Sequence, residues 1–505
     1  MRKSLVLAAT VACACGDNDG DPPCEVVPQA LPPAGPLSDP SMLPMPDDCV
    51  PGGLAGLAGR WFVRDPDSLF QFHYPLYEER CDGAMATHGH EDDRDLTDDR
   101  RIQYQYSDGT VLFDYLYLRF EQPNFVYEIA RAEAVCLRAD GSLGGAYGAF
   151  QTDFGARTGT YLGSPFGPKE EAEAGGVVRV GELGTSSNGA PMSSYNLVVE
   201  GGLAYMAGPT GFDIIDVSDA KNPRALGHVD EGWNDVRVAH VGGRSYAYGA
   251  SFAGEVTTVV DVTDPAAPVV AGVMPTYSHS VQIVDGKLYL ANYTSAIPVF
   301  DIAANPALPV LLGEIRISDA PVPGAVHDLT VDGTRVFANH TTAGFVALDV
   351  SAGLEQPAVE LARAPGSYSH ASWAGTAGGT RLVLHGDEGL TGTPDGAAFL
   401  RVMGGDPAVS SFFMKELGRY QSRPEVGIHN FELHGDRVYI AYYQDGVRIV
   451  DVSTPAKPKE VGFYNTLDYA TAIGAPFEGA LGIRVVDGLI YVADSNRGLI
   501  ILREQ

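Results

Sequence analysis

The chain has 505 residues, a formal net charge of −30 and an isoelectric point near 4.6. This acidity argues against nucleic-acid binding, because phosphates require a basic surface, and against direct contact of the globular part with anionic lipid. The 60 glycines and 34 prolines are typical of a turn-rich all-β protein, and the length predicts two domains behind a leader.

Residues 1–15 read as a bacterial lipoprotein signal. Arg2 and Lys3 precede the run SLVLAATVA, which is too short to span a bilayer as a mature helix. Small residues before Cys15 resemble the junction at which a cysteine becomes the acylated N-terminus. Cys13 is the alternative lipidation site, and an ordinary secretory signal is a third interpretation. The prediction is a cell-envelope protein, at the outer membrane or cell surface, held to the membrane only by its lipid.

Residues 16–53 are rich in proline, glycine and aspartate, which predicts a tether. Four cysteines then remain in an oxidising compartment, and their even number predicts disulfides. Three pairings are open, of which the most local joins Cys24 to Cys49 and Cys81 to Cys136.

Residues 54–165 show aromatic alternation, as in IQYQY at 102–106, with hairpin signals at Asp108-Gly109 and Asp140-Gly141. They predict a small antiparallel β domain. The segment LAGRWFV at 57–63 resembles the first strand of lipocalin-like barrels, and that resemblance implies a barrel able to hold a small apolar ligand. The simpler alternative places the aromatic residues in an ordinary core.

Residues 176–505 contain seven copies of one repeat. The clearest copy, at 429–463, reads HNFELHGDRVYIAYYQDGVRIVDVSTPAKPKEVGF and predicts four short strands. Five third strands end in an aspartate that we expect to cap the following turn, and Arg401 and Arg503 take this position in two further copies. The aspartates are Asp216, Asp261, Asp301, Asp349 and Asp451. Spacings from 40 residues (261 to 301) to 52 residues (349 to 401) suit blades of a β-propeller.

The last copy stops after its third strand. The segment VVRVGEL at 177–183, ahead of the first copy, resembles the fourth strands of other copies, such as PKEVGFY at 458–464. We therefore predict that this N-terminal strand completes the last blade and closes a seven-bladed ring, which protects sheet edges from aggregation.

The third-strand sequences IIDVS at 214–218 and IVDVS at 449–453 resemble the LVIVD-repeat family of bacterial surface and secreted proteins. The resemblance covers about two thirds of the chain. It implies a β-propeller fold and no common activity.

Four histidines stand where first strands begin: His279, His327, His370 and His429. First strands are innermost in a propeller, and the loops after the second strands open on the same face. These loops supply Asn292, Asn339, His340, His385, Asp387 and Asp494. Neutral imidazoles and carboxylates bind divalent metals, so a ligand or metal site at the channel mouth is one hypothesis.

Counting back from the turn glycine places His327 and His429 in one slot and His279 one residue earlier, with Tyr195 and Gly482 as equivalents in other blades. His370, in a degenerate copy, is not placed by this count. The alternative hypothesis is that His-Asp and His-Asn pairs satisfy backbone groups where each blade begins.

The leading functional prediction is a monomeric binding module for an extracytoplasmic protein, glycan or small ligand, and not an enzyme. No GxSxG, HExxH, Walker or dinucleotide motif is present. The alternative is a hydrolase-like enzyme that uses a divalent metal at the channel mouth.

Overall fold

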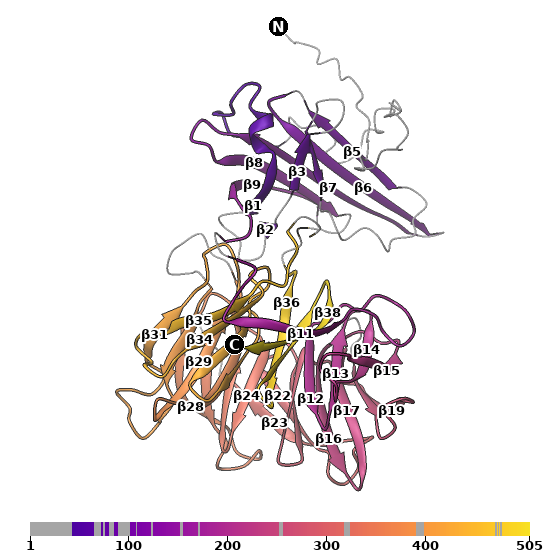
Figure 1. Ribbon diagram of the computed structural model, residues 1–505, viewed down its shortest axis with the longest axis vertical. Coiled ribbons are helices and arrows are strands. Elements are labelled where there is room, and N and C mark those ends of the chain that lie inside the picture. The colour runs from indigo at the N-terminus through magenta and orange to yellow at the C-terminus, as the bar shows by residue number, and fades with distance from the viewer. Residues whose placement is uncertain are drawn as a thin grey trace. The chain divides into compact units, whose positions relative to one another are not determined.

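The computed structural model describes residues 43–64, 72–73, 76–79, 85–88, 101–107, 109–122, 125–151, 155–169, 172–251, 256–317, 324–389, 398–469, 472, 474 and 477–505. Two compact units are present (Figure 1): Met1–Pro168 with Tyr469–Pro476, and Lys169–Asp468 with Phe477–Gln505. The predicted leader, including Cys13 and Cys15, lies outside the described residues. In the described part, no helix is long and apolar enough to cross a membrane.

The N-terminal unit is one antiparallel sheet with the order β4-β3-β1-β9-β8-β7-β6-β5, and β2 pairs with β1. Trp61 on β1 is buried, and its Nε1 donates to the Leu57 carbonyl at 2.8 Å. The elements are η2 (Leu54–Leu57), β1 (Gly59–Arg64), β2 (Phe72–His73), β3 (Leu76–Glu79), β4 (Met85–His88), β5 (Arg101–Ser107), β6 (Leu112–Gln122), β7 (Phe125–Leu137), β8 (Leu143–Gln151) and β9 (Gly155–Pro165). The antiparallel β domain is thus confirmed, while its closure into a lipocalin-like barrel stays a prediction.

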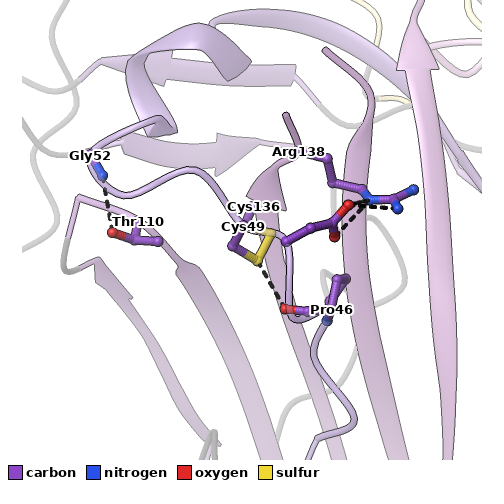
Figure 2. The surroundings of a disulfide bond; sticks show 7 residues. Pro46, Cys49, Gly52, Thr110, Cys136 and Arg138 are labelled. Carbon is purple, nitrogen blue, oxygen red and sulfur yellow. Dashed lines mark hydrogen bonds and ion pairs between the residues drawn. A yellow bond between two sulfur atoms is a disulfide. The ribbon is translucent and has the colours of Figure 1, made fainter. Parts of the chain in front are cut away.

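A disulfide in this unit joins Cys49 to Cys136, with Cα atoms 5.6 Å apart across 87 residues of sequence (Figure 2). The local pairing of Cys49 with Cys24 and of Cys136 with Cys81 is therefore wrong. The reason is tertiary: residue 49 forms a β-bridge to Arg138, just beyond β7, and Asp48 forms an ion pair with the same arginine at 2.7 Å. Cys24 and Cys81 lie outside the described residues.

The second unit is a seven-bladed β-propeller, as predicted. Each blade is a four-stranded antiparallel sheet, and we number the blades by their first strands. Blade 1 comprises β12 (Asn196–Glu200), β13 (Leu203–Gly208), β14 (Gly211–Asp216) and β15 (Arg224–Val229). Blade 2 comprises β16 (Trp233–Val241), β17 (Arg244–Ser251), β18 (Thr257–Asp261) and β19 (Val269–Met274). Blade 3 comprises β20 (Ser280–Val284), β21 (Lys287–Ala291), β22 (Ala296–Asp301) and β23 (Val310–Arg316).

The remaining four blades follow the same plan. Blade 4 comprises β24 (Asp328–Asp332), β25 (Arg335–Asn339), β26 (Phe345–Asp349) and β27 (Val359–Ala364), and blade 5 comprises β28 (Ser369–Ala377), β29 (Thr380–Asp387), β30 (Leu400–Gly404) and β31 (Glu416–Tyr420). Blade 6 comprises β32 (Phe431–His434), β33 (Arg437–Ala441), β34 (Val447–Asp451) and β35 (Lys459–Tyr464), and β10 (Ala174–Gly175) extends it at the edge. Blade 7 comprises β36 (Ala480–Val486), β37 (Leu489–Asp494) and β38 (Gly498–Glu504), and β11 (Val177–Leu183) completes it.

Strand β11 closes the ring, as the repeat count predicts. It pairs with β38 from Val177↔Glu504 to Leu183↔Leu499, and Figure 1 shows the two side by side. Each first strand contacts the first strand of the next blade, and β36 of blade 7 returns to β12 of blade 1. The seven first strands therefore form the innermost ring.

The five third-strand aspartates each accept a hydrogen bond from the backbone N–H two residues later, at 2.8–3.0 Å. In blade 1 the register of the fourth strand shifts between Ile214 and Ile215, so that the aspartate is the second residue after the shift. In blade 7 the shift lies between Ile501 and Leu502, which places Arg503 at the aspartate position, as predicted. The assignment of Arg401 to this position in blade 5 is wrong. The shift there lies between Val402 and Met403, which places Gly404 at the aspartate position.

Apolar faces of successive blades pack against each other to form the core. Ile297 and Val299 of β22, for example, cluster with Val336 of β25 and Val346 of β26. Glycines in the fourth strands let the proline-bearing turn of the next blade approach closely. A Cβ on Gly272 would lie 1.9 Å from the Ala307 carbonyl oxygen, so no larger residue fits there.

The first prediction concerns ring closure. Val177 is 2 % exposed in the cluster that joins blades 6 and 7. A Val177→Asp substitution places an unpaired carboxylate there, and we expect the propeller to lose more than about 3 kcal/mol of unfolding free energy. Calorimetry of the full chain measures this loss. The control, Val178→Asp, alters the adjacent, more exposed position and should cost about 1 kcal/mol or less. Equal losses for both variants would show that β11 does not seal the ring.

Candidate functional site

Four consecutive blades carry a histidine at one structural position of their first strands. In blade 3, the third-strand Asp301 lies opposite Lys287 on the second strand. Counting Lys287 as the first residue, the fifth residue of that strand is Ala291, which pairs with Ser280 on the first strand. The residue before Ser280 is His279, and we call this position the slot. The same count reaches His327 in blade 4, His370 in blade 5 and His429 in blade 6. In blades 1, 2 and 7 it reaches Tyr195, Asn234 and Leu481.

His279 therefore shares the slot of His327 and His429, and the predicted offset of one residue is wrong. The hairpin of blade 3 turns at Asp285 and Gly286, both with positive φ, so its glycine is the second turn residue. In blades 4 and 6 the turn glycine, Gly333 or Gly435, is the first turn residue. Both are standard two-residue hairpins, but a count from the glycine differs by one between them.

A longer hairpin explains why His370 could not be placed by counting. The pairing of β28 with β29 is regular from Ala371 to the turn, but the residue opposite Gly404 is Leu382, two residues beyond the start of β29, whereas in blade 3 the equivalent residue is Lys287, the first residue of β21. His370 itself lies in a β-bulge between Ser369 and Ala371. A matching shift in blade 7 lies between Ala480 and Gly482. The equivalent residue there is Leu481, not Gly482 as the count from the glycine gave.

The shared slot brings the four imidazoles into one continuous row, which we call the histidine row. Ring centroids are 3.9 Å apart for His279 and His327, 4.3 Å for His327 and His370, and 4.5 Å for His370 and His429. Interplanar angles of 44–49° make each contact tilted. Because the blades are adjacent, the row follows the inner ring at the end where first strands begin.

Burial keeps the histidine row neutral at pH 7. Desolvation lowers the pKa of His279 to about 4 and the pKa values of His370 and His429 to about 3. It lowers the pKa of His327 well below the usual range, and the neighbouring imidazoles add to this effect. Neutral rings can lie this close without charge repulsion, and each retains one nitrogen lone pair for a ligand.

Hydrogen bonds fix the tautomer at both ends of the row. The Nδ1 of His279 donates to the His327 carbonyl at 3.2 Å, and the Nδ1 of His429 donates to the Leu481 carbonyl at 2.6 Å. A carbonyl only accepts, so in these neutral rings Nε2 carries the lone pair. In the middle of the row, His370 interacts with the backbone of His429, while the buried Nδ1 of His327 has no hydrogen-bond partner among the described residues.

Three tyrosines from neighbouring loops surround the row. Tyr293 packs against His279 and His327 at 5.0 and 5.3 Å between centroids, Tyr368 against His327 at 5.6 Å, and Tyr443 against His429 at 4.9 Å. Tyr293 and Tyr443 have φ values of 55° and 43°, and Thr341, at the same position of blade 4, has 41°. The left-handed backbone is therefore a recurring feature of this loop, and in blades 3 and 6 the residue there is a tyrosine that contacts the row.

Glu388 supplies the carboxylate nearest to the row. Its Oε2 lies 3.7 Å from Nε2 of His370, and its other oxygen accepts a hydrogen bond from the Tyr443 hydroxyl. Burial raises the pKa of Glu388. One nitrogen each of His327 and His370 and one oxygen of Glu388 all lie within 4.8 Å of one another. These three residues are the only group among the described residues with spacing that suits a metal ion.

The other predicted site residues form hydrogen bonds within a blade or between neighbouring blades. Asn339 and His385 both bond to the Ser369 hydroxyl, at 3.2 and 2.9 Å, and His340 bonds to the Ser295 hydroxyl at 3.2 Å. Asn292 accepts from the backbone N–H of Thr294 at 3.2 Å.

Two predicted carboxylates likewise have structural partners. Asp387 forms a buried ion pair with Arg401 at 2.9 Å, and Asp494 accepts from the backbone N–H groups of Asn496 and Arg497. These partners link strands within a blade, join neighbouring blades or cap a turn. The role of these loop residues as ligands at the channel mouth stays a prediction.

Sequence reasoning missed Glu388 and the tyrosines. Glu388 directly follows the predicted Asp387, and the two side chains of neighbouring residues reach different partners. Tyr293 and Tyr443 each stand two residues beyond the last residue of a second strand, Ala291 or Ala441. That shared position is a signal that an alignment of the copies by their second strands would have revealed.

Comparison with known families finds three segments that match the LVIVD repeat, at residues 193–231, 429–466 and 479–502. The chain contains LVIVD repeats. The matched segments start at residues 193, 429 and 479, close to the slot residues of their blades, which are Tyr195, His429 and Leu481. No curated protein matches the sequence.

Solved β-propellers are similar at low identity. The WD40 β-propeller domain of Doa1 is 10% identical with a TM-score of 0.46, over 65% of this chain and 98% of that one. BamB from Moraxella catarrhalis is 11% identical with a TM-score of 0.39, over 80% and 98%. The C-terminal WD40 domain of Sif2 is 12% identical with a TM-score of 0.40, over 78% and 92%. The blade assignment itself follows from the strand pairing of this chain.

The second prediction concerns Asp494, whose pKa burial raises to about 6. The folded protein takes up this proton at a higher pH than the unfolded chain does, so the group adds stability below pH 4 and loses that contribution as pH rises through 6. We expect the unfolding free energy of the wild type, relative to Asp494→Asn, to increase by about 2 kcal/mol from pH 7.5 to pH 4.5. Urea titrations of both proteins at both pH values measure this difference in unfolding free energy. A difference that stays the same at pH 7.5 and pH 4.5 would contradict a raised pKa for Asp494.

Proposed function

We propose that the protein is a lipid-anchored binding module of the bacterial cell envelope whose ligand site is the end of the inner ring that carries the histidine row. The observation that supports this most is the row itself, with its three tyrosines. Four consecutive blades supply an imidazole at one slot, and three loops each add an aromatic ring.

A purely structural role accounts poorly for this arrangement. Blades 1, 2 and 7 build the same inner ring with Tyr195, Asn234 and Leu481 in the slot, so the fold does not require histidine there. A buried polar atom without a partner costs stability, and Nδ1 of His327, in the middle of the row, is such an atom among the described residues. Stability given up at one place in a regular scaffold is what a binding site requires.

The ligand class follows from the residues at this end that solvent reaches. Tyr293 and Phe477 are 37 % and 40 % exposed, and each packs against residues of the site, Phe477 through Tyr443 at 5.4 Å. Exposed aromatic faces suit the ring of a sugar, an apolar side chain of a protein or a small planar ligand. An extracytoplasmic protein or glycan is accordingly the partner that we propose for this monomer.

The third prediction tests the location of the binding site. We expect Tyr293→Asn with Phe477→Ala to abolish capture of an envelope partner or glycan, because both aromatic faces are removed. Asparagine tolerates the left-handed backbone at position 293. Crosslinking in envelope preparations and a glycan array are the measurements.

The matched control is Val269→Ala with Leu308→Ala, which removes comparably exposed apolar residues from outer positions of blades 2 and 3. This control should retain binding. Loss of binding in the control alone would move the site to the outer strands, and the absence of any partner for the wild type would contradict the binding module.

The fourth prediction concerns the anchor. Acylation of Cys15 requires its thiol, so Cys15→Ser should leave the protein in the soluble envelope fraction, whereas Cys13→Ser should leave it on the membrane. Fractionation and mass spectrometry of the N-terminal peptide measure this. Release by Cys13→Ser alone would assign lipidation to Cys13, and a membrane-bound double variant would contradict lipid anchoring.

A metal-dependent extracytoplasmic enzyme is a second candidate function, favoured by the placement of Glu388 beside His327 and His370. Two imidazoles and one carboxylate form the ligand set of several hydrolytic zinc enzymes. A turnover that stops when the metal is removed would favour this candidate over the binding module.

A further inference from the structure

We infer that His327, His370 and Glu388 bind one divalent transition-metal ion and leave at least one coordination position open for an exogenous ligand. This inference rests on the proposed function, because it assigns chemistry to the same end of the inner ring. It assigns two of the four histidines of the row, together with Glu388, as ligands and gives the other residues separate roles.

The donor set favours a transition metal over calcium or magnesium. Imidazole nitrogen suits zinc, iron, copper and nickel, whereas the alkaline-earth ions prefer oxygen ligands in greater number. Two imidazoles with one carboxylate is the set found in zinc sites that retain a water molecule and in iron sites with open positions. Three protein ligands do not complete a tetrahedral or octahedral shell, so an exogenous molecule can bind the ion.

The spacing allows this coordination after a small contraction. Metal–ligand bonds of roughly 2.0–2.2 Å place neighbouring ligand atoms roughly 3–3.6 Å apart. The His370 Nε2 to Glu388 Oε2 distance is 3.7 Å, and the three donor atoms lie within 4.8 Å of one another. Rotation of side chains by about 1 Å brings all three to bonding distance.

Hydrogen bonds separate His327 from the other three histidines. His279 and His429, at the ends of the row, satisfy Nδ1 with a backbone carbonyl of the next blade. His370 likewise interacts with the backbone of His429, and its Nε2 is the nitrogen that lies 3.7 Å from Oε2 of Glu388. His327 has a buried Nδ1 without a partner among the described residues, and a bound ion beside this ring would account for it.

Tyr443 would act as an outer partner of the metal. Its hydroxyl donates to one oxygen of Glu388, which leaves the other oxygen towards His370. A hydrogen bond of this kind orients a carboxylate ligand and raises metal affinity.

The fifth prediction tests the metal site on the full chain. Elemental analysis of natively purified protein should find one transition-metal ion per chain. Calorimetric titration of chelator-treated protein with Zn²⁺ should return one site. Glu388→Gln and His370→Gln each remove a ligand at nearly constant volume and should weaken Zn²⁺ binding by at least about 100-fold. Tyr443→Phe should weaken it by about 10- to 100-fold.

The matched control is His279→Gln, which alters the same slot of blade 3 outside the proposed ligand set and should keep affinity within a few-fold of the wild type. Metal-induced stabilisation provides a second readout: Zn²⁺ should raise the melting temperature of the wild type and of His279→Gln, but not that of Glu388→Gln. This comparison remains informative if a variant is itself less stable.

Two results would overturn the inference: no site for Zn²⁺, Co²⁺ or Fe²⁺ in the wild type, or a site whose affinity Glu388→Gln leaves unchanged. Failure of the inference is distinguishable from failure of the proposed function. Chelator-treated protein that still captures its partner through Tyr293 and Phe477 would retain the binding module without the metal. A bound metal with no partner would retain the metal site without the module.

Discussion

The pairing of β11 with β38 is the constraint on which the propeller depends. Without it, blade 7 would have three strands, and the outer edge of β38 would expose unpaired backbone groups. The same strand buries Val177 against residues of blades 6 and 7, so edge pairing and core packing are supplied together. Because the closing strand comes from the start of the repeat region, the two ends of this unit are held in one sheet.

Closure also determines what the histidines can do. A single blade presents one imidazole at its first strand, and one isolated imidazole defines no site. The ring places four successive blades side by side, so that rings 3.9–4.5 Å apart form a row although their residues are separated by 43 to 59 positions in sequence (327 to 370 and 370 to 429). The row is therefore a property of the inner ring as a whole.

The row also shows how one repeat can serve both scaffold and site. The third-strand aspartates cap turns away from the inner ring, as at Asp216, where hydrogen bonds from Ser218 hold the pKa of the carboxyl low. These positions repeat because every blade requires the same turn. The histidine slot varies between blades, and that variation restricts the row to blades 3 to 6. Repetition thus marks the scaffold, and departure from it marks the candidate site.

The sequence by itself determined the seven copies, the four-strand plan and the closing segment at 177–183, because strand periodicity and turn residues are local signals that recur in each copy. It also singled out four histidines at the starts of first strands. Only the tertiary structure decided that His279 and His370 share a slot with His327 and His429, since turn type and hairpin length alter the count from the turn glycine without changing the strand pattern. It likewise decided that Glu388, rather than Asp387, faces the row, and that Cys49 bonds to Cys136. Contacts between side chains from different strands depend on how the sheets pack, and spacing along the chain does not encode that packing.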